Sequence, residues 1–74
     1  MVDQVSKDYL EARGVIDEPL PGAKFKIKLD NGQFIIGHLS GKMRMNRIRL
    51  LPGDEVKVEM SLYDLTKGRV VYRF

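Results

Sequence analysis

AKFKIKL, residues 23–29, alternates lysines with apolar side chains and has the clearest strand pattern in the chain. Its phenylalanine, isoleucine and leucine fall on one side of an extended chain and its lysines on the other, which is the two-residue period of a half-buried strand. The sequence DNG follows at residues 30–32, and Asn31 and Gly32 tolerate the positive φ that a tight hairpin turn requires. A partner strand is therefore expected at residues 33–40.

Two later segments also have the pattern of strands. Residues 55–60, EVKVEM, alternate again directly after the turn signal PGD at residues 52–54. The valines and the methionine of this segment are expected to face inward. The last strand is expected at residues 69–74, with Val70 and Tyr72 on its inner side and its arginines on the outer side.

The N-terminal part of the chain is less regular. A strand interrupted by Gly14 is expected at residues 9–17, and the two prolines of EPLPG, residues 18–22, are expected to exclude ladder pairing there. Gly37, within the strand at residues 33–40, is expected to mark a bend or bulge of the kind that curves a sheet towards closure.

Five short strands with a basic interlude between the third and the fourth are typical of an all-β, five-stranded Greek-key barrel, the OB fold. A short helical turn is expected within that interlude. An SH3-like barrel or a small open sheet is the alternative, because periodicity does not fix how strands connect. The predicted core consists of Val15, Phe25, Ile27, Val56, Val58 and Val70.

The length and composition of the chain limit its class. A chain of 74 residues is near the lower limit at which one core holds a fold, so a single domain at residues 8–74 is expected after a flexible tail at residues 1–7. The absence of cysteine excludes disulfides and thiolate metal sites. No apolar run is long enough for a signal peptide or a membrane span. These features predict a cytoplasmic monomer that contacts no membrane.

The positive charge is concentrated in the middle of the chain. The formal charge is only +3, but no acid lies between Asp30 and Asp54. This interval contains His38 and four cations, Lys42, Arg44, Arg47 and Arg49. Such an asymmetry is typical of a protein that binds a polyanion.

The segment at residues 40–49 is the main candidate for RNA binding. Met43, Met45 and Ile48 are expected to anchor it on the barrel and leave its cations free, and three of those four cations are arginines, whose planar fork of donors matches phosphate oxygens. The alternative is a solvated loop whose charges only aid solubility.

A second basic surface is expected from Lys67, Arg69 and Arg73 in the last loop and strand. The lysines of residues 24–28 have two interpretations. They extend this basic surface, or they are ordinary outward lysines that protect an edge strand from aggregation. His38 is either a partly exposed RNA contact or a satisfied residue at the barrel edge.

Exposed rings distinguish two modes of RNA binding. Proteins that bind single strands stack bases on exposed aromatic side chains. Tyr9 and Tyr63 are expected to be exposed and Phe25 and Tyr72 to face inward, while Phe34 is ambiguous. A stacking platform is therefore weak, and recognition is expected to rest on phosphates and RNA shape, which disfavours an RNA chaperone of the cold-shock type.

Other functions lack their residues. The single histidine has no cysteine or acid cluster at ligand spacing, so neither a metal nor another cofactor is expected. A nucleophile with its base, a carboxylate pair in a cleft and a phosphate-binding glycine loop are all absent, so the chain is not expected to be an enzyme. A structural Sm-like subunit would need an extended apolar edge or a long tail, and neither is evident.

Three motifs resemble one family. The sequences GHLSGKMR at 37–44, IRLLPGD at 48–54 and YDLTKGR at 63–69 occur in the order typical of bacterial translation initiation factor 1, with the LDNG hairpin at 29–32 also in place. The resemblance runs from about residue 9 to residue 73, and the joint match is far more specific than any single motif.

The resemblance implies an OB-fold protein of the S1-like type and a set of contacts. Such proteins bind the small ribosomal subunit at the decoding A site, keep elongator tRNA out and support initiation factors two and three, without catalysis. The resemblance implies that ribosomal RNA is contacted by Lys42, Arg44, Asn46 and Arg49. It further places near the RNA, or near the ribosomal protein of the decoding region, His38, Tyr63, Lys67, Arg69 and Arg73. Met45 and Arg47 depart from the family pattern, and Arg47 is included among the RNA-binding residues for its charge.

Overall fold

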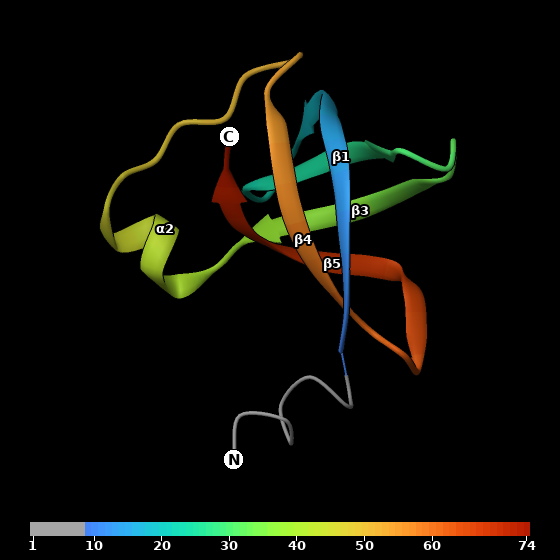
Figure 1. Cartoon of the computed structure of the whole chain (residues 1–74). Coiled ribbons are helices and arrows are strands. Elements are labelled where there is room, and N and C mark those ends of the chain that lie inside the picture. Colours follow the sequence, from blue (N-terminus) through green and yellow to red (C-terminus); the bar gives the residue numbers. More distant parts are fainter. Residues whose placement is uncertain (1–8) are drawn as a thin grey trace.

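The protein is a closed barrel of five strands (Figure 1), seen in a computed structural model that describes residues 9–74. The expected tail at residues 1–7 lies outside the described residues. The elements are β1 (Tyr9–Leu20), β2 (Lys24–Leu29), β3 (Phe34–Leu39), α2 (Gly41–Met45), β4 (Glu55–Ser61) and β5 (Asp64–Arg73).

The strand order around the barrel is β1-β2-β3-β5-β4. The β3–β5 pair is parallel, and the other four pairs are antiparallel. This connectivity, with a short helix between β3 and β4, is that of the OB fold, so the predicted architecture is confirmed. Figure 1 shows α2 at one end of the barrel and the β2–β3 and β4–β5 turns at the other. Among residues 9–74 no helix is long and apolar enough to cross a bilayer.

The core lies inside the barrel and confirms most of the prediction. The predicted core residues that are fully enclosed are Ile27, Val56, Val58 and Val70. Phe25 is only partly buried, although it packs against this cluster. The core also includes Ile16, Leu29, Ile35, Met43, Leu50 and Met60.

Val15 was predicted for the core, and this prediction is wrong. Gly14 lies on the inner face of β1, where an added Cβ would come within 2.9 Å of Ile27 Cγ2, so Ile16 also points inward and Val15 points outward. Ile16 is 1 % exposed, whereas Val15 is half-buried. The glycine therefore determines which residues of β1 face the core.

Pro19 does not end β1, contrary to expectation, and the strand ends at Leu20, just before Pro21. Glu18 and Pro19 pair with Lys26 and Phe25 of β2, after a register shift that follows Ile16. The ladder between β1 and β4 already ends at Val15, so the other edge of β1 is free at Pro19. A proline is tolerated there because it removes no ladder hydrogen bond.

Tyr72 was expected to face inward, and it faces outward. Val58 pairs with Val70 but Lys57 pairs with Tyr72, so Val71 is an extra residue on β5. This bulge moves Tyr72 to the outer side with Lys57, where its side chain is 54 % exposed. The same shift places Arg73 opposite Val56, at the end of the barrel near α2.

The hairpin at residues 30–32 forms as predicted. The Leu29 N–H donates to the Gln33 carbonyl at 2.7 Å, and Gly32 has a φ of 92°. Gly37, however, marks a close contact and not a bulge, because the β2–β3 register is continuous there. A Cβ at Gly37 would lie 2.5 Å from Ile27 Cδ1.

Candidate nucleic-acid interface

The short helix α2 presents the first group of predicted contacts. Its N-terminus is capped by Ser40, whose Oγ accepts a hydrogen bond from the Met43 N–H at 3.2 Å. The side chain of Met43 is buried and fastens the helix to the core. Because this anchor faces the barrel, Lys42 and Arg44 are left exposed to solvent.

Arg47 ends the helix in a left-handed conformation. Its φ is 54°, the Arg47 N–H donates to the Arg44 carbonyl, and the Ile48 N–H donates to the Met43 carbonyl, each at 3.1 Å. These are the two hydrogen bonds of a Schellman motif, in which glycine usually occupies this position. The arrangement directs the Arg47 side chain away from the core and into solvent.

Arg73 connects the end of β5 to the loop after α2. Its Nη1 donates to the Arg49 carbonyl at 2.8 Å. A hollow of about 280 Å³ lies beside this bond, lined by Lys42, Met43, Asn46, Ile48, Val71, Tyr72 and Arg73. The fold therefore brings together three of the predicted contacts from segments far apart in the sequence.

A second group of predicted contacts lies where β3 meets β5. His38 pairs with Arg69, and Ile36 pairs with Lys67. A hollow of about 240 Å³ is lined there by Tyr9, His38, Glu59, Ser61, Lys67, Gly68 and Arg69. Tyr63, also predicted as a contact, is 88 % exposed in the β4–β5 turn and lines neither hollow.

The lysines of β2 continue this second group across the sheet. Lys24 pairs with His38, and Lys26 pairs with Ile36. Because β2 is hydrogen-bonded to β1 and to β3, it has no free edge, so edge protection does not explain these lysines. We define the basic face as the outward residues of β2, β3 and β5: Lys24, Lys26, Lys28, Phe34, Ile36, His38, Lys67 and Arg69.

Aromatic side chains are more exposed than the sequence predicted. Tyr9 and Tyr63 are exposed as expected, but Phe34 is 49 % exposed and Tyr72 and Phe74 are each 54 % exposed. Phe34 lies on the basic face with Lys26 Nζ 4.7 Å from its ring centre. Tyr72 and Phe74 meet edge to face at 5.1 Å, away from Phe34. The exposure of Tyr72 was not predicted because it depends on the bulge at Val71, which the alternation of the sequence does not reveal.

Carboxylates neutralise cations on the other side of the barrel. Glu55 lies 2.9 Å from Arg13, and Glu11 lies 3.9 Å from Lys57. A third ion pair joins Arg69 to a carboxylate of β4, and within residues 9–74 it is the one contact of this type on the basic face. In the described part of the chain, the cations of β2 and α2 have no carboxylate within 4 Å.

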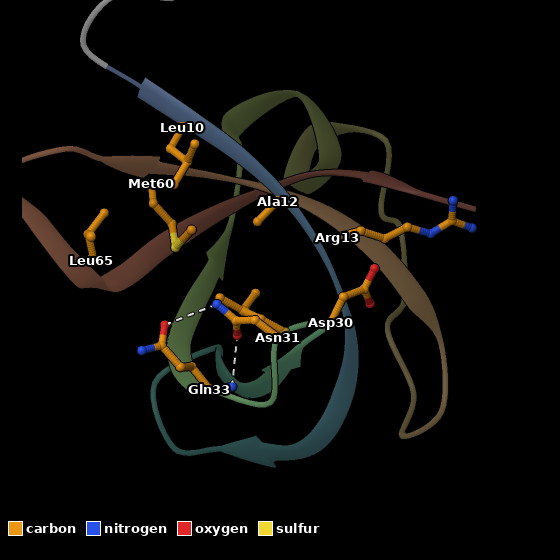
Figure 2. A pocket seen from close by; sticks show the side chains of 9 residues that line it. Leu10, Ala12, Arg13, Asp30, Asn31, Gln33, Met60 and Leu65 are labelled. Atoms are coloured by element: carbon orange, nitrogen blue, oxygen red, sulfur yellow. Dashed lines mark hydrogen bonds between the residues drawn. The ribbon is translucent and has the colours of Figure 1, made fainter.

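A third hollow, of about 340 Å³, lies at the barrel end away from α2 (Figure 2). Leu10, Met60 and Leu65 form its apolar side, and opposite them the Gln33 N–H donates to Asn31 Oδ1 at 2.9 Å. No group of three histidine or acidic side chains within residues 9–74 is arranged to hold a metal ion. Arg13 and Asp30 also line this hollow.

Comparisons with known proteins agree with the fold. The family described as translation initiation factor 1A / IF-1 matches residues 3–74. The chain belongs to this family. A solved structure of translation initiation factor 1 from the Wolbachia endosymbiont strain TRS of Brugia malayi is 48% identical, with a TM-score of 0.77, and the match covers 100% of this chain and 88% of that one.

A more distant structure shares the fold alone. YjeQ from Thermotoga maritima is 22% identical with a TM-score of 0.69, over 88% of this chain and 23% of that chain. Membership of the initiation factor family assigns the chain to protein biosynthesis, with RNA binding at the ribosome. The resemblance seen in the sequence motifs is thereby confirmed at the level of the family.

Proposed function

We propose that this initiation factor binds the small ribosomal subunit at the decoding A site through ribosomal RNA, blocks premature binding of elongator tRNA and supports initiation factors two and three. It acts as a cytoplasmic monomer and catalyses no reaction. The observation that carries the proposal is the continuity of two cationic surfaces. β3 ends at Leu39, α2 begins at Gly41, and α2 contacts both β3 and β5, so the cations of residues 42–49 lie next to one end of the basic face.

The chemistry of this surface suits the phosphate backbone of folded RNA. Arg44, Arg47 and Arg49 are exposed, and each guanidinium offers a planar set of donors to phosphate oxygens. The cations come from a helix, a loop and two strands, β2 and β5, whose positions are fixed by one core. Such an array matches phosphates by shape, because no rearrangement of the barrel is needed before binding.

The experiment replaces Arg44 and Arg49 by glutamine together. Labelled protein is titrated with purified small subunits at several salt concentrations. If both side chains contact phosphates, affinity falls and the slope of log K against log salt becomes shallower by about one to two units. Circular dichroism confirms that the variant is folded. Unchanged affinity with an unchanged slope would reduce this segment to a solvated loop.

The A-site assignment has its own test. Binding of an elongator tRNA to programmed small subunits is measured with increasing amounts of the protein. The proposal expects competition that disappears for the variant with both arginines replaced. Binding of the protein and the tRNA to the same subunit without mutual interference would place the protein elsewhere.

One observation favours a second function, the binding of single-stranded RNA. Phe34 is exposed on the basic face beside Lys26 and Lys28, and a ring among cations can stack a base. Fluorescence anisotropy with short polypyrimidine RNA tests this. We expect weak binding that high salt abolishes, because the basic face offers only the rings of Phe34 and His38 and no row of aromatic side chains. Tight binding that survives high salt and is lost in Phe34→Ala would favour the chaperone function.

A further inference from the structure

One row of outward side chains crosses all five strands at the same level. Direct register pairs connect β1 to β4, β4 to β5, β5 to β3 and β3 to β2. In that order, the row consists of Glu11, Glu59, Arg69, His38 and Lys24. It begins with two acids and ends with a lysine, and the change of charge falls between Glu59 and Arg69.

Glu59 and Arg69 are in contact at this boundary. Arg69 Nη2 donates to Glu59 Oε1 at 2.7 Å, a short distance for a charge-assisted bond. The Glu59 side chain is 23% exposed, against 55% for Glu55 and 61% for Glu11 in the other two ion pairs. Glu59 is thus the most enclosed of these carboxylates and the best fixed in place.

The contact leaves most of the Arg69 guanidinium available. A guanidinium has five N–H donors, and Arg69 makes a single side-chain hydrogen bond to the residues that the structure describes. Glu59, Arg69, His38 and Lys67 all line the same open hollow. The guanidinium is therefore held at one side while its remaining donors are free for a ligand at the basic face.

We propose that Glu59 is a positioning residue for RNA binding, which holds the Arg69 guanidinium in the orientation that contacts a phosphate. The proposal rests on the proposed function, because it assumes that Arg69 contacts the RNA. A free arginine side chain loses rotamer entropy when it binds, and a carboxylate that already orients it reduces that loss. An acid on an RNA-binding face thereby strengthens binding in spite of its charge.

Simple electrostatics predicts the opposite sign, and this makes the proposal testable. Removal of a negative charge from the edge of a basic face should strengthen binding to a polyanion. The loss of a positioning contact should weaken it, by about 3- to 10-fold for one immobilised side chain. Glu59→Ala removes the charge and the acceptor, whereas Glu59→Gln removes the charge but keeps an oxygen that can accept from Arg69.

The experiment measures equilibrium binding to purified small subunits at one moderate salt concentration for Glu59→Ala, Glu59→Gln and Arg69→Gln. We expect the alanine variant to bind about 3- to 10-fold more weakly and the glutamine variant to lose less. The control is Glu55→Ala, which removes an acid of the same strand that pairs with Arg13 on the opposite side. Its affinity should be unchanged or slightly higher. Thermal melts verify that all variants fold.

The combined variant Glu59→Ala/Arg69→Gln completes the test. If Glu59 acts through Arg69, this variant binds no more weakly than Arg69→Gln alone. Equal or tighter binding by Glu59→Ala, while Arg69→Gln weakens binding, would overturn the positioning role and leave the proposed function intact. Full binding by Arg69→Gln would instead remove Arg69 from the RNA interface, and the positioning role would be refuted with it.

Discussion

The two outer sides of the barrel have similar cations but differ in whether acids pair with them. On the basic face, formed by β2, β3 and β5, the lysines have no carboxylate partner among the described residues. On the other side, which we call the paired face, β1 and β4 contribute Glu11, Arg13, Glu55 and Lys57, and each cation lies within 4 Å of an acid. A formal charge of +3 is thus not spread over the surface, because the paired acids leave the excess on one side.

Strand register produces this difference. In the β1–β4 ladder, Arg13 lies opposite Lys57 and Glu11 opposite Glu59, so the ion pairs run diagonally between neighbouring positions. On the β3 side, Lys24 and Lys26 lie opposite His38 and Ile36, which offer no carboxylate. On the β1 side, Lys26 lies opposite Glu18, but among the described residues these two side chains form no ion pair within 4 Å. A polyanion is therefore expected to bind where the cations are unpaired, and the total charge of the chain does not show where that is.

The largest expected effect is on the core that supports both faces. Gly37→Ala places a Cβ where Ile27 Cδ1 lies 2.5 Å away, so we expect a loss of about 1–3 kcal/mol in the free energy of unfolding from overpacking. Ile27→Val removes that methyl group and should itself destabilise by about 0.5–1.5 kcal/mol. The double variant should be more stable than the sum of the two changes predicts. Urea denaturation followed by circular dichroism measures all four proteins.

Two observations would contradict this explanation of Gly37. One is a Gly37→Ala protein as stable as the parent, and the other is strict additivity in the double variant. Either would show that Ile27 does not require the glycine. For these core variants, binding to small subunits should fall in proportion to the folded fraction, because the core supports both faces equally.

Much of the fold follows from the sequence, and the exceptions have local causes. The alternation at residues 24–29 and 55–60 was sufficient to identify β2 and β4, because one side of each strand is uniformly apolar. The predictions for Val15 and Tyr72 were wrong about which side of its strand each residue faces. A glycine on the inner side of β1 and one extra residue in β5 set these sides, and both depend on partners distant in the sequence.

The site shows the same limit. The cations of residues 42–49 are contiguous in the sequence, so their charge could be identified before the fold. The hollow shared by His38 and Arg69 depends on the parallel β3–β5 pairing, which no local pattern reveals. The contribution of Glu59 was missed because an acid in an alternating strand resembles any other solvent-facing residue.

The second prediction tests the comparison of the two faces directly. Lys26→Gln with Lys67→Gln removes two charges from the basic face, and Arg13→Gln with Lys57→Gln removes two from the paired face. At moderate salt we expect about tenfold weaker binding to small subunits for the first variant, because two phosphate contacts are lost. The second variant should change affinity by less than about twofold, since its cations are already neutralised.

The salt dependence separates contact from general attraction. The slope of log K against log salt should become shallower by about one to two units in the first variant only. If both variants lose affinity equally, the protein responds to net charge and the distinction between the faces has no functional meaning. Melting curves for both variants verify that the ion pairs of the paired face are not needed for folding.

The smallest expected effect concerns Asp64, the first residue of β5, directly after the turn where the chain passes from the paired face to the basic face. The Thr66 hydroxyl and the Thr66 N–H both donate to Asp64 Oδ1. These bonds, the hydroxyl first, hold the pKa of the Asp64 carboxyl below its ordinary value, and the charge of Lys67 adds to the effect. Because the pKa is lower in the folded state, the stabilisation is fully present above the pKa of the unfolded chain and is lost as pH falls through the folded value.

Titration of the Asp64 side-chain carboxyl by NMR checks this assignment. The parent protein should titrate at a lower pH than an ordinary aspartate, and Thr66→Val should raise that midpoint only part of the way, because the backbone N–H still donates. Asp64→Asn should remove this contribution to the acid dependence while it keeps an oxygen that accepts from Thr66. A midpoint that does not move in Thr66→Val would mean that the hydroxyl bond is not the main cause. The lowered pKa of Asp64 would then have to come from the hydrogen bond of the Thr66 N–H and from the charge of Lys67.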